Sequence, residues 1–287
     1  MGGLLVFSNI FLFLPILIYF DGIKTFFVFI NIGDFLLFYT FFTIFFLIGL
    51  FDDIKNLTPR SRLFMTFLAS FSIIVLDNSL IIESISLFNF EINFFYKLLS
   101  ILFSVFCIIV LINSLNMLDG INLQFTIYCI IIILFIASKN PNIIFMLILI
   151  PLIFFSYLNL RSKAFMGDAG TYSIAFFFSY ILIKSFNKSL MNEIEIVLFL
   201  LIPGLELIRV FSVRIMNKKS PFRGDRNHLH HYLIERTNLA NSLVIFIFLS
   251  SIPTILNQFT NKMLSFLVPT AFYFLTIYLL KNKSIKG

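Results

Sequence analysis

Long apolar runs separated by short polar segments occupy nearly the whole of this 287-residue chain, and they constrain its fold more than any single motif does. Only 12% of the residues are charged, and the mean hydropathy is +1.01. Such a chain has too little polar surface to coat a water-soluble globule. In a bilayer the backbone must satisfy its own hydrogen bonds, the runs are too long for strands, and no alternating pattern recurs for a barrel. The sequence therefore predicts an all-α, polytopic integral membrane protein with one domain over residues 1–287.

A helix of about 20 apolar residues crosses the hydrocarbon core of a bilayer. Counting the apolar runs on this basis predicts about ten transmembrane helices. Their approximate bounds are 4–20, 35–51, 63–82, 95–112, 123–137, 143–158, 171–186, 194–208, 239–256 and 263–280.

The distribution of Lys and Arg predicts the orientation. Alternate loops divide the 21 basic residues into one set of 15 and another of 6. By the positive-inside rule the richer set is cytoplasmic, so both termini are expected in the cytoplasm and the number of spans is even. The net charge of +7 then reflects topology and contact with lipid headgroups, and a nucleic-acid partner is not expected.

Five carboxylates lie at or near the ends of apolar runs, where they are costly unless they bind something. They are Asp52, Asp53, Asp119, Asp168 and Glu206. In the predicted topology all five fall on the cytoplasmic side together with the three histidines, whereas the acidic residues of the outer loops show no motif-like clustering. The sequence therefore predicts an active site at the cytoplasmic face.

The five carboxylates belong to polar segments that we number in chain order. The first, at Asp52 and Asp53, and the third, around Asp168, suit a metal ion and phosphate. Adjacent Asp52 and Asp53 repel each other unless a cation relieves them, and Mg²⁺ or Mn²⁺ bound with phosphate oxygens and water would do so. A plain helix end followed by a turn at Pro59 is the alternative. Asp168 lies between two glycines at the start of a span, where backbone N–H groups could approach a phosphate while the carboxylate holds the metal. For Asp168 the alternative is a simple helix N-cap.

The second segment repeats a polar residue at every third position. Asn113, Asn116 and Asp119 are thereby expected along one side of a final helical turn, where two amides and a carboxylate can orient a base or a sugar. The alternative is helix C-capping by Asn and Gly120, which explains the glycine but not the spacing.

The fourth segment, in the longest predicted cytoplasmic loop, concentrates donors and imidazoles. Guanidinium groups suit a diphosphate, and imidazoles suit hydrogen bonding or proton transfer. The alternatives are a basic loop that merely contains histidines, or a structural zinc, which is poorly supported because both cysteines lie within apolar spans. The candidate residues are Arg223, Arg226, His228, His230 and His231.

Taken in order, the four segments resemble one known family, the polyprenyl-phosphate N-acetylhexosamine-1-phosphate transferases of glycosyltransferase family 4. The resemblance covers about residues 2–231. It is carried by Gly49-Leu-Phe-Asp-Asp53, Asn113-Ser-Leu-Asn-Met-Leu-Asp-Gly120, Phe165-Met-Gly-Asp-Ala-Gly170 and Asp225-Arg-Asn-His-Leu-His-His231.

The resemblance implies a multi-pass enzyme of the bacterial inner membrane. It would transfer HexNAc-1-phosphate, with GlcNAc or a related sugar, from a UDP-N-acetylhexosamine to undecaprenyl phosphate, release UMP, require Mg²⁺ or Mn²⁺, and start a surface glycan such as O-antigen or another cell-wall polysaccharide. The His-x-His-His form resembles the undecaprenyl-phosphate GlcNAc-1-phosphate transferases more than the phospho-MurNAc-pentapeptide transferases of peptidoglycan synthesis, which are the alternative. A homodimer is a family expectation.

The resemblance, together with the needs of phosphoryl transfer, assigns roles to the candidate residues. Glu206, where the family often has Asp, is expected to support the site. Family members also carry an extra span ahead of the two glycines at positions 2 and 3, so the chain is expected to begin one span late. The expected catalytic residues are Asp52, Asp53, Asp119, Asp168 and His230, with Asp53 and Asp168 as metal ligands. The expected substrate-binding residues are Asn113, Asn116, Arg223, Arg226, His228 and His231.

Two other classes of membrane protein fit the sequence less well. A CDP-alcohol phosphotransferase needs Ala-Arg shortly after its Asp-Gly, whereas Asp119-Gly120 is followed by Ile-Asn-Leu. A transporter would place charged residues at mid-membrane on broken helices, but these acidic residues lie near the ends of spans.

Overall fold

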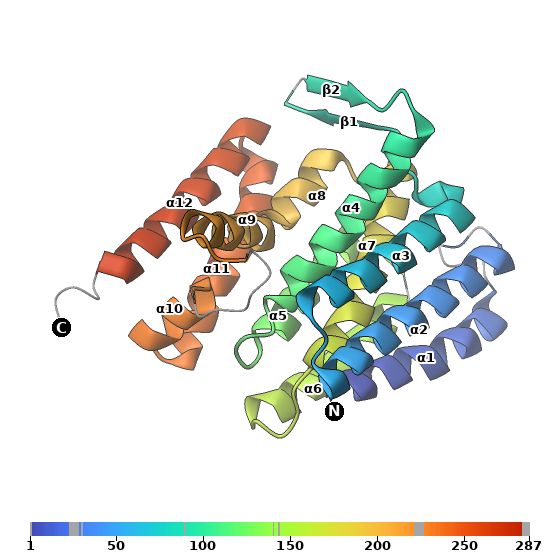
Figure 1. Cartoon of the computed structure of the whole chain (residues 1–287), viewed down its shortest axis with the longest axis horizontal. Coiled ribbons are helices and arrows are strands. Elements are labelled where there is room, and N and C mark those ends of the chain that lie inside the picture. The colour runs from blue at the N-terminus through green and yellow to red at the C-terminus, as the bar shows by residue number, and fades with distance from the viewer. Residues whose placement is uncertain are drawn as a thin grey trace.

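In the computed structural model the chain is a bundle of helices with one small β-hairpin at an end of the bundle (Figure 1). The structure describes residues 2–22, 29, 31–88, 90–139, 141–142, 144–220 and 227–282. The helices are α1 (Gly2–Asp21), α2 (Ile32–Lys55), α3 (Pro59–Leu76), α4 (Lys97–Asn116), α5 (Gln124–Lys139), α6 (Ile144–Leu160), α7 (Gly167–Asn187), α8 (Glu193–Phe199), α9 (Leu201–Met216), α10 (Leu229–Arg236), α11 (Leu239–Phe259) and α12 (Lys262–Asn282), with a short 3₁₀ helix at Asn78–Leu80. The hairpin pairs β1 (Ser84–Leu87) with β2 (Phe90–Asn93), antiparallel.

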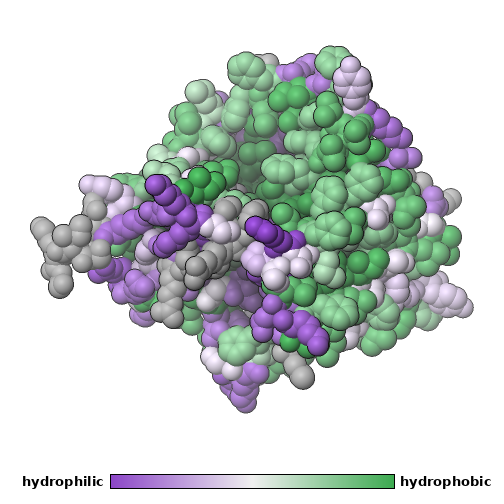
Figure 2. Space-filling model, in the orientation of Figure 1, coloured by the Kyte–Doolittle hydropathy of each residue, from purple (hydrophilic) through white to green (hydrophobic). Residues whose placement is uncertain are grey.

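The all-α, multi-pass architecture predicted from the sequence is confirmed. Within the described residues, 7 helices are long and apolar enough to cross a membrane, or up to 8 if the bent pair α8 and α9 is one span. The helices α5 and α6 are apolar but shorter. Each of the ten predicted runs overlaps one of these helices or the bent pair, while the count of ten spans stays a prediction. In Figure 2, apolar side chains cover most of the visible face, and hydrophilic ones gather toward the side of α10.

Two predicted spans differ from the helices observed. The third was expected to reach position 82, but α3 ends at Leu76, because the side chain of Asp77 accepts a hydrogen bond from the Ser79 backbone at 3.1 Å and starts a tight turn. The predicted span 194–208 is bent by 63° between α8 and α9. Pro203 cannot donate to the Phe199 carbonyl four residues earlier, and that carbonyl accepts instead from the Tyr128 hydroxyl at 2.8 Å.

Helix α7 is the centre of the bundle. In the 18-residue apolar stretch of α7, 94% of the residues are buried, and α2, α4 and α1 pack around the helix. Association of helices in lipid depends on close packing, and here the Phe45 and Phe176 rings stack at 4.6 Å. Gly49 of α2 lies so close to the Asp168 backbone that any side chain at position 49 would overlap it. The end of α2 is thereby brought against the start of α7.

The opposite ends of these helices are held by buried charges. Lys184 is 1% exposed, and its ammonium lies 2.9 Å from the carboxylate of Asp77 and 3.7 Å from that of Asp34. The Tyr180 hydroxyl donates to Asp77 at 3.0 Å. Burial raises the pKa of Asp77, but hydrogen bonds from Ser79, Lys184 and Tyr180 and the Lys184 charge outweigh it and lower that pKa below its usual value. Asp34 of α2 and Asp77 at the end of α3 therefore share one lysine in space, although they are far apart in the sequence.

The β-hairpin was not predicted, since only helices were expected. Ser86 of β1 joins it to α8, because both its backbone N–H, at 3.1 Å, and its hydroxyl donate to Glu193. The Phe88 ring also meets the Phe266 ring of α12 at 5.6 Å. The hairpin therefore connects the α4 side of the bundle to α8 and α12.

Candidate active site

The carboxylate of Asp53, in the last turn of α2, lies against the first turn of α7. It accepts hydrogen bonds from the backbone N–H groups of Asp168 at 2.9 Å and Ala169 at 3.0 Å. The N-cap residue of α7, Met166, provides no side-chain cap, so a residue of another helix takes that part. Beside it, Gly167 has φ +69°, and a Cβ there would lie 2.8 Å from Asp53. Backbone conformation and space both require glycine at 167.

The backbone donors at the start of α7 are thus occupied by carboxylates. The Gly167 N–H donates to Asp119 at 3.3 Å, and the next two donate to Asp53. Protein anions therefore fill this positive end of the helix, and the approach of a phosphate to these donors stays a prediction. Asp168 is also not the N-cap, since it is the second residue of α7.

Asp52 and Asp168 form a carboxylate pair bridged by Arg62 of α3. The Arg62 guanidinium lies 3.0 Å from Asp52 and 3.8 Å from Asp168. Asp52 is 4% exposed, and one of its oxygens accepts from the Leu57 backbone at 2.9 Å. Asn116 donates to Asp168 at 2.8 Å, so the second and third segments meet as predicted.

Sequence reasoning used Arg62 only to predict topology. Its signal was local: Thr58 caps α3 by accepting from the Ser61 backbone at 3.2 Å, and Pro59 is its first residue. A capped helix that starts after a three-residue connection from α2 turns Arg62, in its first turn, back toward the acidic pair. That signal could have placed Arg62 in the site.

Asp119 lies in the turn that follows α4, outside the helices. Burial, followed by the charges of Asp168 and Asp53, raises its pKa to about 7, and the hydrogen bond from Gly167 only partly opposes this. Asn113 is directed elsewhere, because its amide donates to the Ile109 carbonyl of its own helix at 2.8 Å. Asn116 and Asp119 therefore contact the α7 start, while the substrate-binding role of Asn113 stays a prediction.

The helix α10, which the sequence did not predict, brings the histidines to this end of the bundle. The His230 ring lies so close to the α-carbon of Gly120 that any side chain at 120 would overlap it. His228 and His230 stack in parallel at 5.3 Å, and the half-buried His231 ring is 4.2 Å from His230. Burial, then the neighbouring histidines, lower the pKa of His230 to about 3, so its imidazole is neutral at physiological pH. The predicted residues Arg223 and Arg226 lie outside the described residues.

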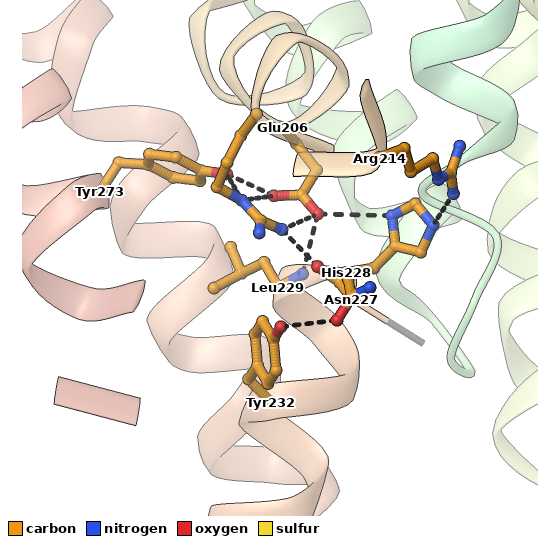
Figure 3. A network of polar contacts seen from close by, with 8 residues as sticks. Glu206, Arg214, Asn227, His228, Leu229, Tyr232 and Tyr273 are labelled. Carbon is orange, nitrogen blue, oxygen red and sulfur yellow. Dashed lines mark hydrogen bonds and ion pairs between the residues drawn. The ribbon is translucent and has the colours of Figure 1, made fainter. Parts of the chain in front are cut away.

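Glu206 of α9 holds the start of α10 (Figure 3). The carboxylate is 4% exposed and accepts from Arg209 at 2.8 and 3.2 Å and from the Leu229 backbone at 2.9 Å. His228 lies between Glu206, at 3.4 Å, and Arg214, at 3.4 Å. Its predicted substrate-binding role stays a prediction, but its ring faces protein on two sides. Glu206, which was expected to support the site, thus binds the first backbone N–H of the helix that carries His230.

Sequence reasoning missed Arg209 and Tyr273 as partners of Glu206. Arg209 could have been found, because acidic and basic residues three apart on one helix commonly pair. Tyr273 could not, since it lies 67 residues away in α12.

An apolar groove of about 400 Å³ runs along α4, α7, α8 and α9. Ile85 and Leu87 of the hairpin line one part of it, and Ser114 and Ile208 line another. Ser114 immediately follows Asn113 in the last turns of α4. A surface suited to an apolar chain therefore extends from the hairpin to the helix that carries Asn116.

Comparison with known proteins decides the family. A family model described as "Glycosyl transferase family 4" matches residues 35–186, which is more than half of the chain. The chain belongs to glycosyl transferase family 4.

The matched segment of the family runs from the start of α2 to the end of α7. It therefore contains the two carboxylate-bearing helices, Arg62, Asn116 and Asp119. The histidines and the Glu206 network come after its last residue, 186, and only the fold shows how they join the site.

Similar proteins include two named undecaprenyl-phosphate alpha-N-acetylglucosaminyl 1-phosphate transferase. The one from Haemophilus influenzae is 36% identical over 76 residues, which is 26% of this chain and 21% of the relative. The one from Thermotoga maritima is 25% identical over 203 residues, covering 70% of this chain and 62% of the relative. The chain thus spans about a fifth of the length of the first of these relatives, and less than two thirds of the second.

Proposed function

We propose that this family 4 protein transfers a HexNAc-1-phosphate from a UDP-N-acetylhexosamine to undecaprenyl phosphate and releases UMP. The observation that carries the proposal is the meeting of the four polar segments at one end of the bundle. Asp53 contacts Asp168, Asn116 contacts Asp168, Asp119 contacts Gly167, and His230 packs on Gly120 beside Asp119. Names of similar proteins support GlcNAc as the sugar.

The chemistry is a displacement at phosphorus. An oxygen of the lipid phosphate forms a P–O bond to the sugar-bearing phosphorus, the bond to the UMP oxygen breaks, and UMP leaves with the electron pair. A phosphate monoester is already ionised at neutral pH, so no carboxylate has to remove a proton. The protein must bring two anions together and neutralise charge as it shifts. Arg62 provides fixed positive charge next to Asp52 and Asp168.

The acidic pair fits Mg²⁺ by its chemistry. Among the described residues, nothing makes a well-directed hydrogen bond to the buried Oδ2 of Asp52, although Arg62 lies 3.0 Å away. The residues that the structure describes also include no group of three or more His, Cys, Asp or Glu that could enclose a metal. One or two carboxylates plus phosphate and water is the usual mode for Mg²⁺. When bound, Mg²⁺ would neutralise phosphoryl oxygens.

We propose Asp52 and Asp168 as the residues that would hold this metal. Asp53 was the metal ligand expected from the sequence. Both of its oxygens accept backbone hydrogen bonds from α7, which favours Asp52 over Asp53. Mn²⁺ could take the same oxygen donors.

We further propose that the apolar groove takes part of the prenyl chain, because its lining extends from Ser114 toward the hairpin. The site would lie at the cytoplasmic face of a bacterial inner membrane, with both termini on that side. The Gly2 backbone donates to Phe165, just before Asp168, at 2.9 Å, and Lys281 lies 5.6 Å from the Tyr232 ring of α10. The start of α1 and the end of α12 are thus near the site. A homodimer remains a prediction.

The experiment is UMP release by detergent-solubilised protein supplied with undecaprenyl phosphate and a panel of UDP-HexNAc donors, with Mg²⁺, with Mn²⁺ and with EDTA. Release that needs lipid, metal and one donor supports the proposal. Asp168→Asn is the inactive control and Tyr278→Phe, on the exposed face of α12, is the active one. Release from UDP-MurNAc-pentapeptide alone would favour the peptidoglycan reaction, and no release with any donor would contradict the transferase.

A further inference from the structure

The carboxylate of Glu206 is the point at which three parts of the chain meet. Arg209 of its own helix donates to both of its oxygens, and the Leu229 N–H, at the start of α10, donates to one of them at 2.9 Å. The same guanidinium donates to the Asn227 carbonyl at 2.6 Å. A buried carboxylate is stable only while such partners surround it, so its orientation and the position of residues 227–229 depend on each other.

Tyr273 of α12 fixes the other side of this carboxylate. Its ring is 0% exposed, its hydroxyl donates to the Glu206 oxygen that does not accept from Leu229, and the same hydroxyl accepts from Arg209 at 2.8 Å. One phenol thus contacts both members of a buried ion pair (Figure 3). Tyr278, five residues later on α12, is 62% exposed and has no part in these contacts.

The contacts continue from Glu206 to the reacting end of the bundle. The histidine segment, residues 228–231, begins where Glu206 accepts from Leu229, and His228 lies 3.4 Å from the same oxygen. The next histidine, His230, packs on Gly120 beside Asp119. We infer that Tyr273 is a positioning residue for the histidine segment and acts through Glu206. The activity part of this inference rests on the proposed function, whereas the structural part does not.

The physical reason is the geometry of the carboxylate. With the phenol in place, one Glu206 oxygen is turned toward Tyr273 and the other toward the first N–H of α10. Without the hydroxyl, the first oxygen keeps only Arg209, and both the carboxylate and the guanidinium lose the group that fixes them to α12. The acceptor offered to Leu229 is then less firmly held, and the start of α10 is freer to shift.

The contact itself can be measured without any substrate. In a background with Cys107→Ala and Cys129→Ala, cysteines introduced by Gly120→Cys and His230→Cys should form a disulfide on oxidation, because the side chain at 230 points at position 120 and small movements of the segment bring the two thiols together. Adding Tyr273→Phe should slow this disulfide formation about tenfold, the usual effect of losing one hydrogen bond to a charged group. Adding Tyr278→Phe is the matched control and should leave the rate unchanged. Equal rates in the two variants would overturn the inference.

The kinetic arm uses UMP release by the otherwise unmodified chain. Tyr273→Phe should lower kcat/KM for the UDP-sugar about tenfold, because the displaced histidine segment carries the predicted substrate-binding residues His228 and His231. Adding Tyr273→Phe to Glu206→Gln should cost nothing further, since both changes break one contact. An unchanged kcat/KM, or additive losses, would overturn the inference. If the wild type releases no UMP at all, the proposed function fails while the disulfide measurement still decides the positioning role.

Discussion

Asp53 and Asp168 look equivalent in sequence, yet the structure gives them different tasks, and asparagine substitutions should separate these. In Asp53→Asn the amide can accept from only one of the two α7 N–H groups now bound at 2.9 and 3.0 Å, and the negative charge at the helix N-terminus is lost. Because Asp53 is exposed, each contact is screened, and we expect a cost of about 1 kcal/mol, typical of losing an N-cap. This corresponds to a fall in Tm of about 2 to 4 °C.

Asp168→Asn should behave differently. Its carboxylate lies beside that of Asp52 and caps nothing, so removing its charge relieves repulsion and should leave Tm unchanged or higher. We expect both variants to lose UMP release. Thermal unfolding of the purified proteins in detergent with EDTA, followed by circular dichroism, measures the difference without any metal contribution. Equal Tm values for the two variants, or a larger fall for Asp168→Asn, would refute the cap assigned to Asp53.

Three further outcomes follow from buried charges. Lys184→Met leaves Asp34 and Asp77 without their shared cation and should lower the free energy of unfolding by about 3 kcal/mol in SDS titration, whereas the exposed Lys188→Met should change it little. The pKa of His230 is lowered from 6.5 to about 3, so its neutral ring contributes stability that is complete above pH 6.5 and is lost as pH falls toward 3. The Tm of His230→Gln should therefore fall less than that of the wild type between pH 6.5 and 4, and parallel curves of Tm against pH would contradict this. The pKa of Asp119 is raised from 3.8 to about 7, so its ionisation costs stability as pH rises above 3.8, and the full cost is reached above pH 7. Asp119→Asn should therefore have a higher Tm than the wild type at pH 8 in EDTA. A lower Tm would contradict the burial of that charge.

Much of the site could be predicted because its parts are local patterns. A span end that carries Asp52 and Asp53, or a threefold repeat that ends at Asp119, is visible in a few consecutive residues. The family match over residues 35–186 agrees with those segments. The bend before α9 also had a local signal in Pro203, although the sequence alone did not show which group would satisfy the Phe199 carbonyl.

The partners of those residues could not be predicted, because they are set by distant helices. That Asp53 caps α7, 115 residues away, depends on the close crossing of α2 and α7 at Gly49. That Lys184 pairs with Asp34 depends on the same two helices meeting again at their other ends, and its pairing with Asp77 depends on the end of α3 packing there too. No periodicity in the sequence records either pairing.

The sequence by itself determined that the chain lies in a membrane, that it is helical, and which of its segments are polar. The reason is that lipid obliges each span to satisfy its own backbone, so composition and length are enough to read the spans. The tertiary structure alone decided which carboxylate caps a helix, which faces Arg62, and how Tyr273 reaches Glu206. In a medium that offers no water, a buried charge takes whichever partner the packing brings near, and packing is a property of the whole bundle.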